Sequence, residues 1–253
     1  MIDALSFIGS YALRPWISID AGGLLGKLSR LGYEGGVVAN LTYLMARNTH
    51  EGNLRLISEV RNTPKLYPAA LMNPEYPYSV GLVEEYSKMG FKAIVIPIPY
   101  QGFRVDEPAA ARVVNRAFKL GMAVLILARL EDERQYPRYI RFNKVLVGEL
   151  ANLLGKVNGE VVVSGLDYPE ALRLVELAGP KFIVDLSSRG IFGKPYSHIE
   201  DLAKRMGVDR LILSLQIPFK SPSASLVKLE LSDLPDNDKE RILKDNVERI
   251  LRL

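Results

Sequence analysis

The sequence "EPAAARVVNRAFKLG" at residues 107–121, with the run "AVLIL" at Ala123–Leu127 just after it, decides the fold. Pro108 suits the first turn of a helix, apolar side chains at 113, 114, 117, 118 and 120 lie on one side, and Gly121 is a common helix stop. The following run is apolar at successive positions, as in a parallel strand covered on both faces. This stretch therefore predicts an amphipathic helix that leads directly into a buried strand.

The same alternation of short apolar runs and helical segments extends along the chain. The eight runs are "IDALSFI", "GGVVAN", "LYPAALM", "KAIVIPI", "AVLILA", "EVVVSGL", "KFIVDLS" and "RLILSLQIP". Eight strands with intervening helices in 253 residues predict an α/β fold, a (β/α)8 TIM barrel formed by residues 1–253 as a single domain. An open doubly wound sheet is the alternative, but no Gly-rich phosphate loop follows any strand.

The C-terminal part of the chain predicts a loop and then extra helix. Residues 215–243, with three prolines, form the most loop-like region of the sequence. Residues 238–253 carry an apolar stripe at helical spacing, made of Ile242, Leu243, Val247, Ile250 and Leu251. We expect this last helix to dock on the barrel.

Composition limits the classes of function. With 48% hydrophobic and 25% charged residues and a net charge of +4, the chain is typical of a globular protein, and nucleic-acid binding is not indicated. It has no cysteine, which excludes disulfides and thiolate zinc sites, and only two histidines, His50 and His198. We find no signal sequence and no membrane-spanning run, so we expect a cytoplasmic protein. Scarce Gln and Thr beside abundant charged residues suggest a thermophilic source, which a melting temperature would test.

Several segments resemble one known family. "DRLILSLQIPF", residues 209–219, is similar without a gap to the eighth-strand motif of the amidohydrolase superfamily in its amidohydrolase-2 branch, roughly Asp-Arg-Ile-Leu-Phe-Gly-Ser-Asp-Tyr-Pro-Phe. "ILKDNVERILRL" resembles the C-terminal helix of that family, and "FKAIVIPIP", "FIVDLSS" and "IDALSFIG" resemble its fourth, seventh and first strands. The resemblance implies a distorted TIM barrel with hydrolysis or decarboxylation at the C-terminal strand ends, usually with a zinc-type ion.

The sequence departs from the metal ligands that the resemblance implies. The two first-strand histidines fall on Leu5 and Phe7, and the fifth-strand histidine falls on Leu127. The sixth-strand histidine falls near Gly165, and the eighth-strand aspartate falls on Gln216. None of these side chains is an ordinary metal ligand, so we expect neither a metal nor another cofactor. A relocated metal would need His50, His198, Asp167 or Asp185.

Polar residues at the predicted C-terminal strand ends remain as the candidate site. Arg129 and Asp185 are the candidate catalytic pair, an electrostatic stabiliser and a general base. Arg129 otherwise forms a salt bridge with Glu131, Asp132 or a neighbouring loop, and Asp185 otherwise pairs with Arg189 or a backbone amide. The candidate ligand-binding residues are Arg14, Asn40, Asn73, Gln101, Arg189, Gln216 and Lys220.

These observations favour an amidohydrolase-like barrel that has lost its catalytic metal and binds a ligand or acts as a scaffold. The alternative is a metal-independent lactonase or esterase that acts on a small anionic substrate at the barrel mouth. A nucleic-acid accessory barrel is a third hypothesis, which would require a contiguous basic surface. A small anionic ligand is the expected partner, and a homo-oligomer is compatible with the sequence because barrels often pair through exposed terminal helices.

Overall fold

A nine-stranded sheet forms the centre of the protein in a computed structural model that describes residues 1–131, 133–138, 140–142 and 144–252. The strands are β1 (Ile2–Tyr11), β2 (Arg14–Ile19), β3 (Gly35–Asn40), β4 (Leu66–Leu71), β5 (Ala93–Ile96), β6 (Ala123–Leu127), β7 (Val161–Ser164), β8 (Phe182–Asp185) and β9 (Leu211–Ile212). Strand β1 pairs in parallel with β3, and from β3 to β9 each strand pairs in parallel with the next. Strand β2 pairs antiparallel with β1, at the edge of the sheet.

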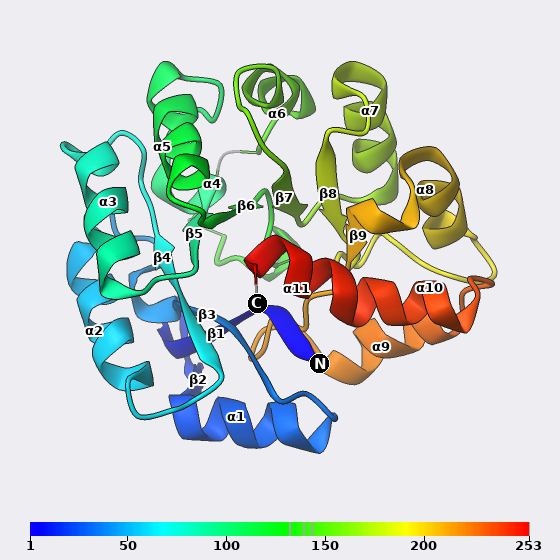
Figure 1. Ribbon diagram of the computed structural model, residues 1–253, viewed down its shortest axis with the longest axis horizontal. Coiled ribbons are helices and arrows are strands. Elements are labelled where there is room, and N and C mark those ends of the chain that lie inside the picture. The colour runs from blue at the N-terminus through cyan, green and yellow to red at the C-terminus, as the bar shows by residue number, and fades with distance from the viewer. Residues whose placement is uncertain (132, 139, 143, 253) are drawn as a thin grey trace.

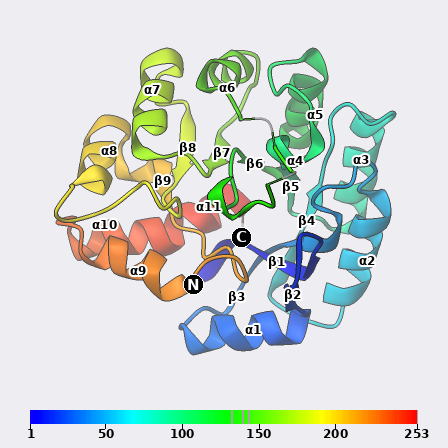
Figure 2. The same cartoon turned by 180° about the vertical axis from the view of Figure 1, so that it is seen from behind.

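Helices surround this sheet (Figure 1; Figure 2 shows the opposite side). They are α1 (Ala21–Arg30), α2 (His50–Val60), α3 (Ser79–Met89), α4 (Ile98–Gln101), α5 (Pro108–Lys119), α6 (Val147–Leu154), α7 (Tyr168–Ala178), α8 (His198–Met206), α9 (Pro222–Glu230), α10 (Asp236–Glu240) and α11 (Asn246–Leu251), which continues a π-helical turn at Arg241–Asp245. Short 3-10 turns lie at Leu41–Tyr43, Glu133–Gln135 and Val208–Arg210.

The barrel closes between β1 and the segment that follows β9. The backbone amide of Gln216 donates to the Leu5 carbonyl at 2.9 Å, and the Phe7 amide donates to the Ile217 carbonyl at 2.8 Å. Side chains of β1 add to this seam, because Asp3 Oδ1 accepts from the Leu215 amide at 2.8 Å. The predicted eight-stranded barrel is confirmed, in a distorted form whose last strand has only two residues in regular ladder geometry.

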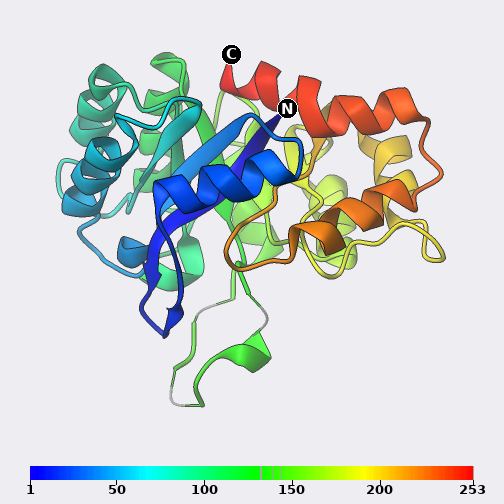
Figure 3. The same cartoon turned by 90° about the horizontal axis from the view of Figure 1, so that it is seen from below.

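Two apolar clusters, one inside the barrel and one between strands and helices, make up the core. In the predicted helix α5, Val113, Val114 and Ala117 are fully buried, as expected from their spacing. The predicted docking of the last helix is also confirmed, since Val247 and Leu251 contact the barrel floor formed by Ala4, Leu125, Val162 and Ile212. Helix α11 thereby covers the N-terminal end of the barrel, on the side opposite to the turn at Glu133–Gln135 (Figure 3).

The prediction of a loop at residues 215–243 is wrong in its centre, where Pro222–Glu230 form α9. Pro222 is the first residue of this helix. Proline is favoured there because the amide hydrogen that it lacks would have no hydrogen-bond partner within the helix. Strand β2 is a further element that apolar periodicity does not reveal, because its antiparallel pairing with Gly9–Tyr11 of β1 defines it. Within the described residues, no helix combines the length and the apolar character needed to cross a membrane.

Candidate functional site at the barrel mouth

A cavity of about 460 Å³ lies at the C-terminal end of the barrel, among the loops that follow β6, β7, β8 and β9. Its described lining includes five basic side chains, those of Arg129, Arg134, Lys144, Arg189 and Lys220. Two acidic side chains, Glu131 and Asp167, also line it. Because basic groups outnumber acidic ones, this mouth cavity suits an anion. A second cavity of about 610 Å³ adjoins it and shares Arg129, Arg134 and Lys144.

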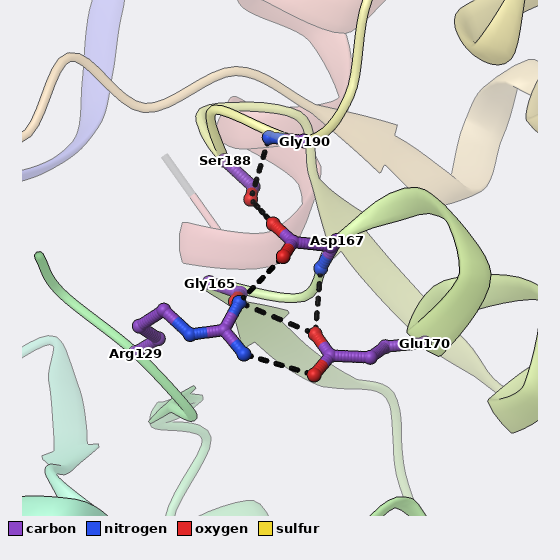
Figure 4. A network of polar contacts seen from close by, with 6 residues as sticks. All are labelled: Arg129, Gly165, Asp167, Glu170, Ser188 and Gly190. Carbon is purple, nitrogen blue, oxygen red and sulfur yellow. Dashed lines mark hydrogen bonds and ion pairs between the residues drawn. The ribbon is translucent and has the colours of Figure 1, made fainter. Parts of the chain in front are cut away.

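Arg129 is held in place by acidic groups of the next βα loop (Figure 4). Its guanidinium contacts Asp167 Oδ2 at 3.0 Å and Glu170 Oε1 at 2.8 Å, and it donates to the Gly165 carbonyl at 3.1 Å. Of the predicted partners of Arg129, the neighbouring loop supplies these ion pairs, and Asp132 lies outside the described residues. These contacts fix the orientation of Arg129 at the cavity wall.

The loop that holds Arg129 depends on a glycine and on a helix cap. Gly165 has φ +90°, and a Cβ there would stand 2.0 Å from the Arg129 carbonyl oxygen, so only glycine fits. Asp167 caps α7 in a capping box with Glu170 and accepts a hydrogen bond from Ser188 Oγ at 2.7 Å. Asp167, a candidate for a relocated metal site, thus stabilises a helix start and pairs with Arg129.

Asp185 is buried and surrounded by hydrogen-bond donors from β7, from the loop after β8 and from the segment after β9. Its carboxylate accepts from the hydroxyls of Ser164, Ser187 and Ser214, from the amides of Ser187 and Ser214, and from Gln216 Nε2. The backbone-amide alternative for Asp185 is thus present, whereas no ion pair with Arg189 occurs between these two described residues. Asp185 is 1% exposed and is absent from the described lining of the mouth cavity, which includes Arg129. Its role as a general base stays a prediction.

Gln216 ties this carboxylate to the barrel seam. Its Nε2 also donates to Ser164 Oγ at 2.6 Å and to Ser187 Oγ at 2.8 Å, and its backbone has φ +48°. Such a φ is uncommon for a residue other than glycine, and the surrounding bonds hold it. Its Oε1 is buried with no hydrogen-bond partner among the described residues.

Two lysines border the Asp185 network. Lys220 Nζ donates to the Ser187 carbonyl at 2.9 Å and to Ser187 Oγ at 3.2 Å, and Lys228 Nζ donates to the carbonyls of Leu186 and Ser188. Burial lowers the pKa of Lys220 to about 7, against the opposing attraction of Asp185. Burial likewise lowers the pKa of Lys228 to about 8. Only Lys220 belongs to the described lining of the mouth cavity.

Carbon fills the positions at which the resemblance would place a metal. Leu5, Phe7 and Leu127 are each 0% exposed and pack in the interior cluster of the barrel. Phe219 covers this cluster. Its ring centroid lies 4.8 Å from that of Tyr11 and 6.0 Å from that of Phe7. These residues do not fit a divalent ion, because none offers an anionic or imidazole donor. In the described part of the chain, no group of three His, Cys, Asp or Glu side chains is placed to hold a metal.

The two histidines lie in separate environments. His50 Nδ1 is 2.9 Å from Tyr86 Oη beside α3. The ring of His198 stacks on Tyr168 with 3.9 Å between centroids, at the start of α8.

Four predicted ligand-binding residues make structural contacts in the first half of the barrel. Asn40 donates to the Gly52 carbonyl at 3.0 Å, Asn73 accepts from the Glu75 amide at 3.0 Å, and Gln101 donates to the Ala46 carbonyl at 3.2 Å. Arg14 lies in β2 and forms an ion pair with the buried Glu131. None of the four belongs to the described lining of the mouth cavity, whereas Arg189 and Lys220 do.

The serines around Asp185 are the part of the site that the sequence interpretation missed. Ser164, Ser187 and Ser214 each stand at the end of an apolar run, in "VVVS", "IVDLS" and "LILS". Ser164 is in register with Asp185, whereas Ser187 and Ser214 each lie two residues beyond paired positions of β8 and β9. Small hydroxyls near the ends of three successive strands were the available signal. Lys228 was also missed, because it lies in the segment predicted to be a loop.

Solved structures with the same fold include several enzymes. A 5-carboxyvanillate decarboxylase from Novosphingobium aromaticivorans, complexed with manganese and 4-hydroxy-3-methoxy-5-nitrobenzoic acid, has a TM-score of 0.76 at 14% identity, covering 100% of this chain and 96% of the other. A probable 2-pyrone-4,6-dicarboxylic acid hydrolase from Acinetobacter baumannii with citric acid bound has a TM-score of 0.74 at 12% identity, covering 100% and 99%. A 2,6-dihydroxybenzoate decarboxylase from Rhizobium has a TM-score of 0.72 at 12% identity, covering 100% and 99%.

At these identities the likeness shows a shared TIM-barrel fold. No protein-family model and no curated protein matches the chain.

Proposed function

We propose that this protein is an amidohydrolase-like barrel, a single domain over residues 1–253, that binds a small organic or inorganic anion at its mouth without a divalent metal. The observation that carries the proposal is the cavity of about 460 Å³ in which Arg129, Arg189 and Lys220 face one space. Guanidinium groups suit carboxylates and phosphates because they donate two parallel hydrogen bonds. A small acid fits a space of this size.

Two features support binding without a metal. Leu5, Phe7 and Leu127 fill the interior below the mouth. A metal ion there would lose its hydration water without gaining ligand atoms. Gln216 directs its amide nitrogen at Asp185, and a neutral amide adds no charge to hold a cation. Positive charge in the proposed site therefore comes from side chains, chiefly Arg189 at the cavity rim. The similar fold of enzymes solved with citric acid or a nitrobenzoic acid is compatible with an acid as the ligand.

The hydrolase alternative, with Arg129 and Asp185 as its pair, has less support. Asp185 is enclosed by donors, whereas a general base must reach water beside the substrate. A screen with lactones and esters at elevated temperature tests it, and turnover that the Arg129→Ala variant loses would favour it. The cytoplasmic location and the heat-adapted source also belong to the proposal.

Calorimetric titration with citrate and with inorganic phosphate, both in excess EDTA, tests the proposed function. We expect one anion to bind in EDTA and the Arg189→Ala variant to weaken its affinity about tenfold or more, because a hydrogen bond to a charged group contributes about 1.5–3 kcal/mol. Arg173→Ala is the matched control, since Arg173 is exposed and pairs with Glu176 on α7. Binding that appears only after manganese or zinc is added would overturn the proposal.

A further inference from the structure

We propose that Lys220 forms a reversible imine with the carbonyl carbon of a small 2-oxo acid bound in the mouth cavity. This inference rests on the proposed anion site and names the class of compound that it takes. Four observations carry it: the position of the amine, its hydrogen-bond partners, the path for its proton, and the cation that would hold the carboxylate.

The amine of Lys220 lies at the wall of the cavity and has no carboxylate partner at ion-pair distance among the described residues. In the described part of the chain its hydrogen bonds go to oxygen atoms of Ser187, which are compatible with a neutral amine as well as with an ammonium ion. Lys65, by contrast, lies on the surface and forms an ion pair with Glu34. Lys220 is therefore placed as a nucleophile would be, beside open space and without a neutralising partner.

Burial favours the unprotonated form of Lys220 near neutral pH. Burial is the largest cause of its lowered pKa of about 7, and the cations Lys228 and Arg189 act in the same direction. Asp185 and Asp167 act in the opposite direction. An ordinary lysine, with a pKa near 10.4, is less than about 0.1% unprotonated at pH 7.

A hydroxyl connects the amine to a buried carboxylate. Ser187 Oγ accepts from Lys220 Nζ at 3.2 Å and donates to Asp185 Oδ2 at 2.9 Å. Imine formation needs proton transfers: the nitrogen bonds to the carbonyl carbon and loses its protons, the oxygen gains them, and water leaves as the C=N bond forms. The chain from Lys220 through Ser187 to Asp185 is placed to pass these protons.

Arg189 gives the reaction its preference for an acid. It is exposed, belongs to the same cavity lining and is adjacent in sequence to the Ser188 that contacts Asp167. A carboxylate next to the carbonyl, as in a 2-oxo acid, would pair with Arg189 while the carbonyl carbon faces Lys220. A simple aldehyde without a carboxylate lacks this contact.

Lys228 provides a matched control within the protein. Its pKa is also lowered, and it donates to the carbonyls of Leu186 and Ser188 at 3.1 and 2.6 Å. It does not belong to the described lining of the mouth cavity. A lowered pKa without access to the cavity should not produce an adduct.

The test is trapping of the imine with sodium cyanoborohydride in the presence of pyruvate, followed by intact-mass measurement and peptide mapping. We expect one reduced adduct at Lys220, formed at a rate that rises with a midpoint near pH 7. The adduct should be absent in Lys220→Met and in Lys220→Arg, which keeps the charge and serves if the methionine variant folds poorly. Lys228→Met should retain it. Arg189→Ala should slow trapping by pyruvate about tenfold but leave trapping by acetaldehyde unchanged.

The outcomes separate this inference from the proposed function. Adducts spread over surface lysines, or equal labelling of Lys220→Met, would overturn the imine. If citrate or phosphate binds in the calorimeter but pyruvate leaves no adduct, the imine is wrong and the anion site stands. If Lys220 is trapped although no anion slows the trapping, the amine is reactive and the anion site is wrong.

Discussion

The two halves of the barrel mouth differ in where their polar side chains find partners. In the first half, Asn40 and Asn73 bond to backbone groups of the loop or helix that directly follows them in the chain. In the second half, Asp185 gathers donors from β7, from its own loop and from the segment after β9. Hydrogen bonds between residues close in sequence stabilise single loops. Hydrogen bonds between separate βα units, as around Asp185, hold those units together. The mouth cavity lies in the second half, among the loops that follow β6 to β9.

The largest expected effect comes from the first half, through stability. Leu5→Ala removes a fully buried side chain from the barrel interior and leaves a cavity. We expect a loss of about 4 kcal/mol in the free energy of unfolding, measured by urea denaturation. Anion affinity should stay within about twofold, because Leu5 does not line the mouth cavity. A large loss of affinity in the folded variant would show that the halves are not separate in function.

Asp185→Asn tests the second half. The serine hydroxyls and Gln216 Nε2 would then meet a neutral amide in place of a charged acceptor. We expect a loss of about 3 kcal/mol in unfolding free energy, because the buried donors lose a charged partner. Asn40→Asp in the first half is the comparison variant. An unfolding free energy unchanged in Asp185→Asn would contradict a structural role for this carboxylate.

The pH dependence of stability sharpens the comparison further. The pKa of Lys220 is about 7 in the folded protein and near 10.5 as an ordinary lysine. Between these values the unfolded chain binds one more proton, so stability from this group rises with pH from about 7 to about 10. We expect the wild type to gain about 1 kcal/mol per pH unit over Lys220→Met in that window. Parallel stability curves for the two proteins would contradict the lowered pKa.

The smallest expected effect concerns the loop that positions Arg129. Asp167→Ala removes a helix cap and an acidic partner of Arg129, which should cost about 1 kcal/mol in unfolding free energy. Glu170 still holds the guanidinium, so anion affinity should fall less than in Arg189→Ala. Thermal unfolding and calorimetry on the same samples measure both quantities. A loss of affinity larger than that of Arg189→Ala would make Asp167 part of the binding site.

The sequence predicts the barrel well because each strand is a run of adjacent apolar residues, as "AVLIL" in β6 shows. It does not predict β2 or α9, since their positions depend on pairing with β1 and on Pro222 at a helix start. At the site, Arg189 and Lys220 were found because they follow strands. The serine partners of Asp185 were not predicted, because a serine near a strand end becomes informative only when the fold brings it to a shared carboxylate.

The seam between β1 and the segment after β9 also has a consequence for the order of folding. Asp3 and Ser6 bond to the amides of Leu215 and Ile217, partners more than 200 residues apart along the chain. These contacts form late, because closing a loop of nearly the whole polypeptide costs conformational entropy. During synthesis the part of β1 from Asp3 to Phe7 therefore lacks its partner on that side, where β2 pairs only with Gly9–Tyr11, until the last strand has left the ribosome. An incomplete chain exposes that edge to other strands, and aggregation of truncated forms follows from the way this barrel closes.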